Sequence, residues 1–337
     1  MNFIVRVATM EDLVALYDLA SQFVLLNLPA DKKALAKKIE NSQASFRGKN
    51  EKADAEYIFV AEDLENKFLA ASSQIVAKNG TPKSPNYSFE VLKKERFSQE
   101  LGIGFIHQIL RLRINTDGAT EVGGLVVDRS YRRRPEKIGK IVSLTRFAYI
   151  AMNPNRFEEE LHAEMAPPLT DEGRSEFWES LGRRFTGMPY KEADLLSQQN
   201  NNFIRSLFPE EDIYLCLLDS RARLALGRVG EETQAALHML EKMGFKYKNE
   251  VDPFDGGPHL GVKTKESSLI KNGTMAIVGK KKGLMYDRMG IVGFGKDHRF
   301  RGGYTSYAQD QDYVYFPDQT WSALKLKEGG EIFVSPI

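Results

Sequence analysis

Residues 132–140 read Arg-Arg-Arg-Pro-Glu-Lys-Ile-Gly-Lys and carry five cationic side chains beside one glutamate. The run follows a segment with strand character and precedes one with helical character. Backbone N–H groups at the start of a helix, together with the helix dipole, favour an anion. We therefore predict that this basic loop binds a diphosphate. The alternative is a solvated basic loop, which is common on protein surfaces.

A second stretch, Asp-Pro-Phe-Asp-Gly-Gly-Pro-His at 252–259, places two carboxylates and an imidazole within eight positions. Asp252 and Asp255 suit a cationic substrate such as a guanidinium, because carboxylates form charge-assisted hydrogen bonds with it. His259 is a candidate proton acceptor. The alternative is a turn, which proline and Gly-Gly would produce in any case.

The motifs of several other enzyme classes do not occur in the sequence. No set of His, Asp and Glu has the spacing of a zinc site, so no metal is predicted. There is no Gly-x-Ser-x-Gly elbow and no Walker-type loop. Phe177 and Trp178 are expected in the core, since aromatic residues at helical spacing usually are. Cys216, in the apolar run 213–218, is also expected in the core rather than as a nucleophile.

Composition narrows the class of protein further. In 337 residues, 47 Lys and Arg balance 46 Asp and Glu, for a net charge of +1, whereas a dedicated nucleic-acid binder is usually clearly basic. A single cysteine excludes an intrachain disulfide and fits a reducing, cytoplasmic setting. The N-terminal residues lack the pattern of a signal peptide, and no apolar run reaches about 18 residues, so no membrane segment is expected.

The strands and helices that must position these residues follow one another in an irregular order along the chain. Strands are predicted at 3–8, 57–61, 68–76, 120–127 and 162–165, and Gly123-Gly124 indicates either a bulge or a close approach of the backbone. Thr9 followed by Asp12 predicts the capped start of a helix. Further helices are predicted at 139–152, 171–185, with Trp178 and Leu181 inward, and 231–243. This order lacks the regular alternation of a doubly wound sheet and predicts a mixed α/β (α+β) fold.

The amino-acid composition of the sequence changes at about residue 267. From there to residue 337, glycines alternate with short β-prone runs such as 276–278 and 313–316. We therefore predict a larger domain at 1–266 and a small β-rich domain at 267–337.

Several stretches spread over most of the chain resemble one family. They include Phe-Val-Ala-Glu-Asp at 59–63, Glu-Met at 164–165, Phe-Trp at 177–178, Leu-Glu-Lys-Met-Gly-Phe at 240–245 and Phe-Asp-Gly-Gly-Pro at 254–258. With them the chain resembles the bacterial arginine N-succinyltransferases, which have the GCN5-related acyltransferase fold. The resemblance implies transfer of succinyl from succinyl-CoA to the α-amine of arginine, or ornithine, in arginine breakdown. It also implies a homo-oligomer or hetero-oligomer.

The resemblance gives the basic loop a role. In this fold a strand, a loop of pattern Arg/Gln-x-x-Gly-x-Gly and a helix cradle the CoA pyrophosphate, and here Lys137 stands at the first glycine of a slightly longer loop. The residues implied to meet the acyl-CoA are Leu125, Val127, Arg134, Lys137, Gly139 and Lys140. Those implied to meet the acceptor are Glu164, Asp252 and Asp255.

One departure concerns catalysis. The family places a catalytic histidine in Gly-Gln-Val-His-Pro, and this chain has Gly-Arg-Val-Gly-Glu at 227–231, so Gly230 stands at the histidine position. His259 and Glu231 are the candidate replacements for the lost base. Pro167-Pro168 is a second departure, at a stretch that contains glycine in the family. The alternative hypothesis is a catalytically impaired member that binds CoA or a metabolite, or a subunit of a hetero-oligomer.

Overall fold

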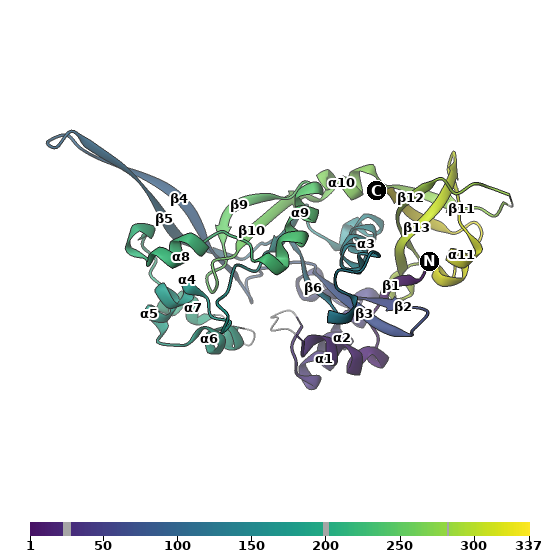
Figure 1. Cartoon of the computed structure of the whole chain (residues 1–337), viewed down its shortest axis with the longest axis horizontal. Coiled ribbons are helices and arrows are strands. Elements are labelled where there is room, and N and C mark those ends of the chain that lie inside the picture. Colours follow the sequence, from purple (N-terminus) through teal and green to yellow (C-terminus); the bar gives the residue numbers. More distant parts are fainter. Residues whose placement is uncertain (23–27, 198–201, 282) are drawn as a thin grey trace. The chain divides into compact units, whose positions relative to one another are not determined.

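The computed structural model describes residues 1–22, 28–197, 202–281 and 283–337, and the chain separates into two compact units (Figure 1). Unit 1 comprises residues 1–78, 119–161 and 263–337, and unit 2 comprises residues 79–118 and 162–262. The boundary predicted between residues 266 and 267 lies inside unit 1, so residues from both sides of it pack in the same unit. Within the described ranges, no helix is long and apolar enough to cross a bilayer.

Unit 1 contains an antiparallel sheet in the order β1-β2-β3-β6 with helices packed on it. These elements are β1 (Phe3–Val7), β2 (Glu56–Asp63), β3 (Phe68–Val76), β6 (Thr120–Val127), α1 (Leu13–Ala20), α2 (Lys32–Phe46) and α3 (Ile138–Met152). Residues 57–61 of β2 are all buried, as expected of a strand covered on both faces. Leu16 of α1 and Leu35 of α2 join Ile58 and Val60 in one apolar cluster. The strands predicted at 68–76 and 120–127 are confirmed.

The C-terminal part of unit 1 is a closed ring of five strands. They are β11 (Thr274–Val278), β12 (Arg288–Phe294), β13 (Arg301–Asp310), β14 (Tyr313–Tyr315) and β15 (Glu331–Pro336), accompanied by α10 (Ser268–Asn272) and α11 (Asp318–Leu324). Their order is β12-β15-β11-β14-β13, and β12 also pairs with β13, which closes the ring. The stretch from residue 267 to residue 337, predicted to be a small β-rich domain, contains these five strands. Because β13 also pairs with β1, this ring continues the sheet that begins at the N-terminus.

Unit 2 is built around antiparallel strands. Their order is β10-β9-β4-β5-β8, and Figure 1 shows β4 and β5 as a long two-stranded ribbon. The strands are β4 (Asn86–Ser98), β5 (Ile103–Asn115), β8 (Ile213–Tyr214), β9 (Lys246–Val251) and β10 (Pro258–Lys263), and β7 (Glu160–Glu164) lies beside β10. The helices are α4 (Glu176–Ser180), α5 (Gly182–Thr186), α6 (Tyr190–Ser197), α7 (Asn202–Leu207), α8 (Ser220–Ala225) and α9 (Gln234–Lys242).

The aromatic pair is in the core of unit 2, as predicted, but the helix around it is shorter than expected. Phe177 and Trp178 are fully buried, and the Trp178 ring stacks on Phe254 at 5.3 Å between centroids. The single helix predicted at 171–185 is wrong, because the chain leaves helical geometry at Leu181 (φ −125°) between α4 and α5. A Cβ on Gly182 would collide with the Trp178 ring, so this glycine permits the close approach.

Cys216 is exposed, so the prediction that it lies in the core is wrong. It belongs to a 3-10 turn, Leu215–Leu217. In such a turn the side chain three residues on returns to the same face. Leu215 and Leu218 therefore point into the core while Cys216 points outward.

Candidate functional site

The strand before the basic loop carries the predicted bulge. In the pairing of β6 with β3, Ser72 lies opposite Val126 and Gln74 lies opposite Gly123, so β6 has an extra residue between these pairs. Gly124 has φ +58°, and a Cβ there would lie 2.9 Å from the Gln74 side chain. Glycine is therefore needed at this position, and the bulge at Gly123-Gly124 is confirmed.

A buried guanidinium, which sequence reasoning missed, holds this bulge. Arg146 of α3 donates from Nη1 to the carbonyl oxygens of Gln74 at 2.9 Å and of Gly123 at 2.7 Å. Burial lowers its pKa to about 9. Leu125 and Val127 follow the bulge, half-buried, on either side of the buried Val126. The bulge thus interrupts regular pairing next to the two residues assigned to the acyl-CoA by resemblance.

The basic loop leads into α3 through a left-handed residue. Lys137 is the N-cap, with φ 53° and ψ 50°. The first hydrogen bond of i to i−4 type in α3 runs from Ile141 N–H to Lys137 O, so the N–H groups of Ile138 and Gly139 precede it and face the loop. A Cβ on Gly139 would lie 3.0 Å from Val127 Cγ2, so glycine brings the helix start close to β6.

The cations of the loop are exposed, and at least two of them contact the protein. Arg132 Nε donates to Val127 O at 3.2 Å. Residues 132–137 are all exposed, as is Lys140. The Arg134 guanidinium lies 4.0 Å from the centre of the Tyr131 ring, and its Nε donates to Ser130 O at 2.7 Å. Unit 1 thus places the N-terminal N–H groups of a helix and several cations in one loop, an arrangement that suits a phosphate.

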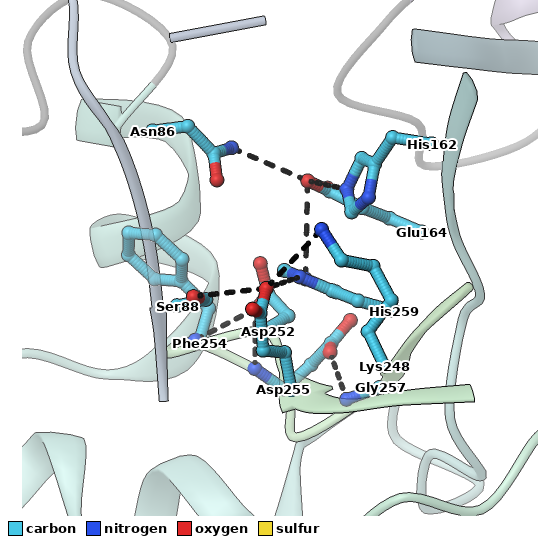
Figure 2. Close-up of polar contacts among 11 residues, drawn as sticks. Asn86, Ser88, His162, Glu164, Lys248, Asp252, Phe254, Asp255, Gly257 and His259 are labelled. Carbon is cyan, nitrogen blue, oxygen red and sulfur yellow. Dashed lines mark hydrogen bonds and ion pairs between the residues drawn. The ribbon is translucent and has the colours of Figure 1, made fainter. Parts of the chain in front are cut away.

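In unit 2, neighbouring strands β7 and β10 bring three side chains together (Figure 2). His162 Nε2 lies 3.2 Å from Glu164 Oε1, and His259 Nε2 lies 3.8 Å from the same oxygen. The two imidazole rings are 4.8 Å apart and nearly perpendicular. Asn86 of β4 donates to Glu164 Oε1 at 3.4 Å. The Glu164 side chain is 30% exposed, whereas that of His259 is 0% exposed, so Glu164 is the member that solvent can reach.

The far side of His259 faces another carboxylate. His259 Nδ1 lies 3.9 Å from Glu250 Oε2 on β9. That oxygen accepts a hydrogen bond from Ser88 Oγ at 3.5 Å and lies 3.7 Å from Lys248 Nζ. We call His162, Glu164, Glu250, Asp252, Asp255 and His259 the carboxylate–histidine cluster.

Burial and mutual charge shift the pKa values in this cluster. Burial would raise the pKa of Glu164, but the hydrogen bond to His162 and the charge of His259 lower it to about 2. Burial, helped by the charge of Glu164, raises the pKa of Asp252 to about 6. Burial would lower the pKa of His259, but the carboxylates of Glu250 and Glu164 outweigh it and raise that pKa. The carboxylates of Glu164 and Glu250 thus favour the charged form of the His259 imidazole, and the raised pKa of Asp252 reflects the crowding of carboxylates in a buried place.

Asp252 and Asp255 also build a turn, as the alternative interpretation predicted. Asp252 Oδ1 accepts hydrogen bonds from the N–H groups of Phe254 at 2.7 Å and Asp255 at 2.9 Å, and Asp255 Oδ1 accepts one from Gly257 at 2.7 Å. A Cβ on Gly257 would collide with the carbonyl oxygen of Met165. The Gly-Gly pair thus lets this turn approach the end of β7.

The two departures from the family pattern lie against each other. Gly230 N–H donates to Ala166 O at 2.9 Å, and a Cβ on Gly230 would lie 2.9 Å from Pro167 O. The backbone at 166–167 therefore takes the space that a side chain at 230 would enter. Glu231 is exposed at the start of the 3-10 turn Glu231–Thr233, whereas His259 is buried, so the structure does not bring the two candidate bases to similar positions.

Sequence reasoning missed three members of this region, namely His162, Glu250 and Lys248. For His162, the sequence contained a pattern that could have indicated its place beside Glu164. His162 and Glu164 alternate on a strand that was predicted, and residues i and i+2 of a strand share a face. Their nearness to His259 had no such signal, because the pairing of β7 with β10 joins positions far apart in the chain.

Comparisons with known proteins agree with each other. The family model described as arginine N-succinyltransferase beta subunit matches residues 3–269. The chain is 38% identical over 264 residues to arginine N-succinyltransferase subunit beta of Pseudomonas aeruginosa, which covers 77% of this chain and 76% of that protein. It is 30% identical over 311 residues to arginine N-succinyltransferase of Photorhabdus laumondii, which covers 91% and 90% of the two chains.

One solved structure is similar over nearly the whole chain. Arginine/ornithine succinyltransferase subunit AI from Pseudomonas aeruginosa has a TM-score of 0.87 at 27% identity, covering 99% of this chain and 98% of the other. The likeness confirms the predicted mixed α/β fold, and it includes both the basic loop and the carboxylate–histidine cluster within its span.

Proposed function

Because the chain belongs to the arginine N-succinyltransferase family, we propose that this acyltransferase moves the succinyl group of succinyl-CoA to the α-amine of arginine or ornithine. The observation that carries the proposal is the match over residues 3–269, which contains the basic loop and the carboxylate–histidine cluster. An acyl-CoA substrate also fits the cytoplasmic setting predicted from the single cysteine.

The acyl-CoA is proposed to bind at the basic loop. The N–H groups of Ile138 and Gly139, with the cations of Arg134, Lys137 and Lys140, would receive the pyrophosphate. The backbone of Leu125 and Val127, after the bulge, would hydrogen-bond the amides of the pantetheine arm. Support comes from the positive φ of Lys137 and from Gly139, which together turn the helix start toward the loop.

The acceptor's cationic groups are proposed to bind at Glu164, Asp252 and Asp255. A guanidinium offers five N–H donors in a planar fork and pairs well with carboxylates. The raised pKa of Asp252, about 6, reflects crowded negative charge that a cation would relieve. Glu164 is the most accessible of the three, so we assign it the direct contact.

The proton acceptor is proposed to be Glu231. It is exposed and follows Gly230, the position of the family's histidine. His259, the other candidate, is fully buried, so it can act on a substrate only through another group, and the group beside it is Glu164. We therefore assign His259 a positioning role.

The chemistry needs few groups. The neutral amine attacks the thioester carbonyl, a C–N bond forms, the C–S bond breaks, and CoA leaves as a thiolate that takes up a proton. The amine proton passes to the base. Holding both substrates together supplies much of the rate, and a general base adds about 10²–10⁴-fold.

The test separates catalysis from binding alone. Release of the CoA thiol is followed with a panel of acyl-CoAs and amines, and CoA binding is measured by calorimetry on the same protein. Turnover highest with succinyl-CoA and arginine or ornithine supports the proposal. CoA binding without turnover for any pair would favour the impaired member instead.

The assembly is proposed to be oligomeric. Two of the similar proteins are named as subunits, beta and AI respectively. Light scattering on the purified chain tests for a homo-oligomer. A monomer that needs a second chain for activity would point to the hetero-oligomer.

A further inference from the structure

We propose that His162, Glu164 and His259 form a binding site for a divalent transition-metal ion, with His162 Nε2, Glu164 Oε1 and His259 Nε2 as the protein ligands. This inference goes beyond the proposed function, and no step of acyl transfer needs the ion. Because Glu164 is also the proposed contact of the acceptor, a bound ion and the acceptor's cationic group would compete for this carboxylate. It also revises the expectation that the chain holds no metal, which rested on spacing in the sequence alone.

The first argument is the geometry of the donor atoms. One potential ligand atom from each residue lies within 4.8 Å of the other two. The two distances to Glu164 Oε1 are 3.2 Å and 3.8 Å. Ligand atoms about 2.0–2.2 Å from a tetrahedral Zn²⁺ lie about 3.3–3.6 Å apart, so small side-chain movements would complete the site.

The second argument is that the buried imidazole of His259 has two carboxylates at ion-pair distance but makes no hydrogen bond. Its side chain is 0% exposed, and neither ring nitrogen has a hydrogen-bond partner in the described part of the chain. Both nearest carboxylate oxygens are too far for hydrogen bonds. A buried polar atom without a partner costs about 1–3 kcal/mol, so two on one ring require an explanation. An ion on Nε2 would satisfy one of them.

The third argument is the carboxylate behind His259. Metal-bound histidines usually donate their other ring N–H to a carboxylate, a carbonyl or a water, which fixes the tautomer. Glu250 Oε2 lies 3.9 Å from Nδ1, and Ser88 and Lys248 hold it there. Glu250 thus occupies the place of such a supporting group, and Asn86 supports Glu164 in the same way.

The local charge agrees with a cation. Glu164, Glu250, Asp252 and Asp255 lie in this cluster, and the ammonium of Lys248 is paired with Glu250. Two imidazoles and one carboxylate are ligands for Zn²⁺, Co²⁺ or Fe²⁺, whereas Ca²⁺ and Mg²⁺ prefer oxygen atoms only. The site therefore selects a transition metal.

Cobalt titration tests the site directly, because Co²⁺ in a protein site absorbs visible light. Tag-free full-length protein, treated with a chelator, is titrated with Co²⁺ at neutral pH and then with Zn²⁺. We expect a visible band that saturates at about one ion per chain and that Zn²⁺ abolishes. A titration without any saturable band would overturn the proposal.

Variants assign the band to these residues. His259→Ala and Glu164→Gln should each weaken Co²⁺ binding by about tenfold or more, and Glu250→Gln by about 10–100-fold, the usual effect of losing a supporting group. His238→Ala removes an exposed histidine on α9 and is the matched control that should bind normally. If His259→Ala fails to fold, Glu164→Gln, at a partly exposed position, carries the test.

Two results would contradict the proposal. One is full-strength binding by both Glu164→Gln and a folded His259→Ala. The other is loss of binding in His238→Ala alone, which would place the ion elsewhere on the surface. Neither measurement requires turnover, so failure here is distinguishable from failure of the proposed function.

Discussion

At position 230, glycine stands where the resemblance implies a catalytic histidine, and the surrounding backbone leaves little room for a side chain. The carbonyl oxygen of Pro167 lies 2.9 Å from the place that a Cβ would take, and Gly230 N–H donates to Ala166 O. The sequence showed both departures, at Gly230 and at Pro167-Pro168, but not that they meet. These residues are brought into contact by tertiary packing, and no pattern of neighbouring residues in the sequence indicates that contact.

Gly230→His should therefore destabilise the protein rather than simply restore a base. The new Cβ would lie 2.9 Å from Pro167 O, and overpacking of this kind costs about 1–3 kcal/mol. Urea unfolding measures the loss. Glu231→His, which adds the same imidazole at the exposed neighbouring position, is the control for stability. Equal stability of the two variants would show that the site has room for a side chain at 230.

Glu231→Gln should lower kcat with little change in protein stability. The amide keeps the shape of the exposed side chain but cannot accept the proton, and a general base contributes about 10²–10⁴-fold. Steady-state kinetics with succinyl-CoA and arginine measure the change. Glu232→Gln, the exposed neighbour, is the matched control. A kcat unchanged in Glu231→Gln would remove this residue from the mechanism.

At the scale of elements, short sequence patterns predicted the strands whose bounds depend on neighbouring residues in the chain. The strands β3 and β6 were predicted at their observed bounds, because apolar runs between turn residues are sufficient signals. The break at Leu181 was not, since it depends on the contact between Gly182 and the Trp178 ring. Likewise, the carboxylate–histidine cluster combines strands whose pairing only the fold provides.

Lys137→Asn tests the start of α3. Asparagine tolerates the left-handed conformation, so the backbone should remain while the charge is lost. We expect the KM for succinyl-CoA to rise about threefold to tenfold, since a charge-assisted contact contributes about 1 kcal/mol or more. Lys325→Asn is the matched control, because Lys325 has the same φ of 53° at the end of α11. Equal KM values in both variants would contradict the assignment.

The capped start before α1 should make unit 1 sensitive to acid. Asp12 accepts hydrogen bonds from Thr9 N–H at 2.7 Å and from two Arg6 nitrogens at 2.8 Å. Burial would raise the pKa of Asp12, but Arg6 and Thr9 lower it below its usual value. The stability from this carboxylate is therefore complete above the ordinary Asp pKa, about 3.9, and is lost as pH falls through the lower folded value.

Urea unfolding of the wild type and Asp12→Asn over this pH range measures the effect. The difference in free energy of unfolding should be largest near neutral pH and should shrink below about pH 4. Asp18→Asn, on the exposed side of α1, controls for the general loss of a negative charge. A difference that stays constant with pH would exclude the contribution of this carboxylate.

At the scale of the whole molecule, the C-terminal ring completes unit 1. Val5 of β1 pairs with Gly302 of β13, and Ile4 packs in the same apolar cluster as Val292 and Ile332. Composition predicted a β-rich stretch from about residue 267, and the first of its strands begins at Thr274. It could not reveal that these strands continue the sheet of the N-terminus, because the join lies between residues about 300 positions apart.

A chain that ends at residue 266 should therefore fail to fold as the intact protein does. It would lose β13, one of the two strands that pair with β1, and most of the apolar cluster around Ile4. Thermal unfolding followed by circular dichroism should show a broad, non-cooperative transition instead of a cooperative one. A sharp transition in the shortened chain would support the boundary predicted at 266 and 267.

The most direct test of the proposed activity is identification of the product. Succinyl-CoA and arginine are incubated with the protein, the amine product is analysed by fragmentation in a mass spectrometer, and released CoA is titrated as free thiol. We predict succinylarginine modified on the α-nitrogen, in an amount equal to the CoA released and absent without arginine. CoA release that does not depend on the amine, or a folded protein that makes no succinylarginine and no succinylornithine, would contradict the account.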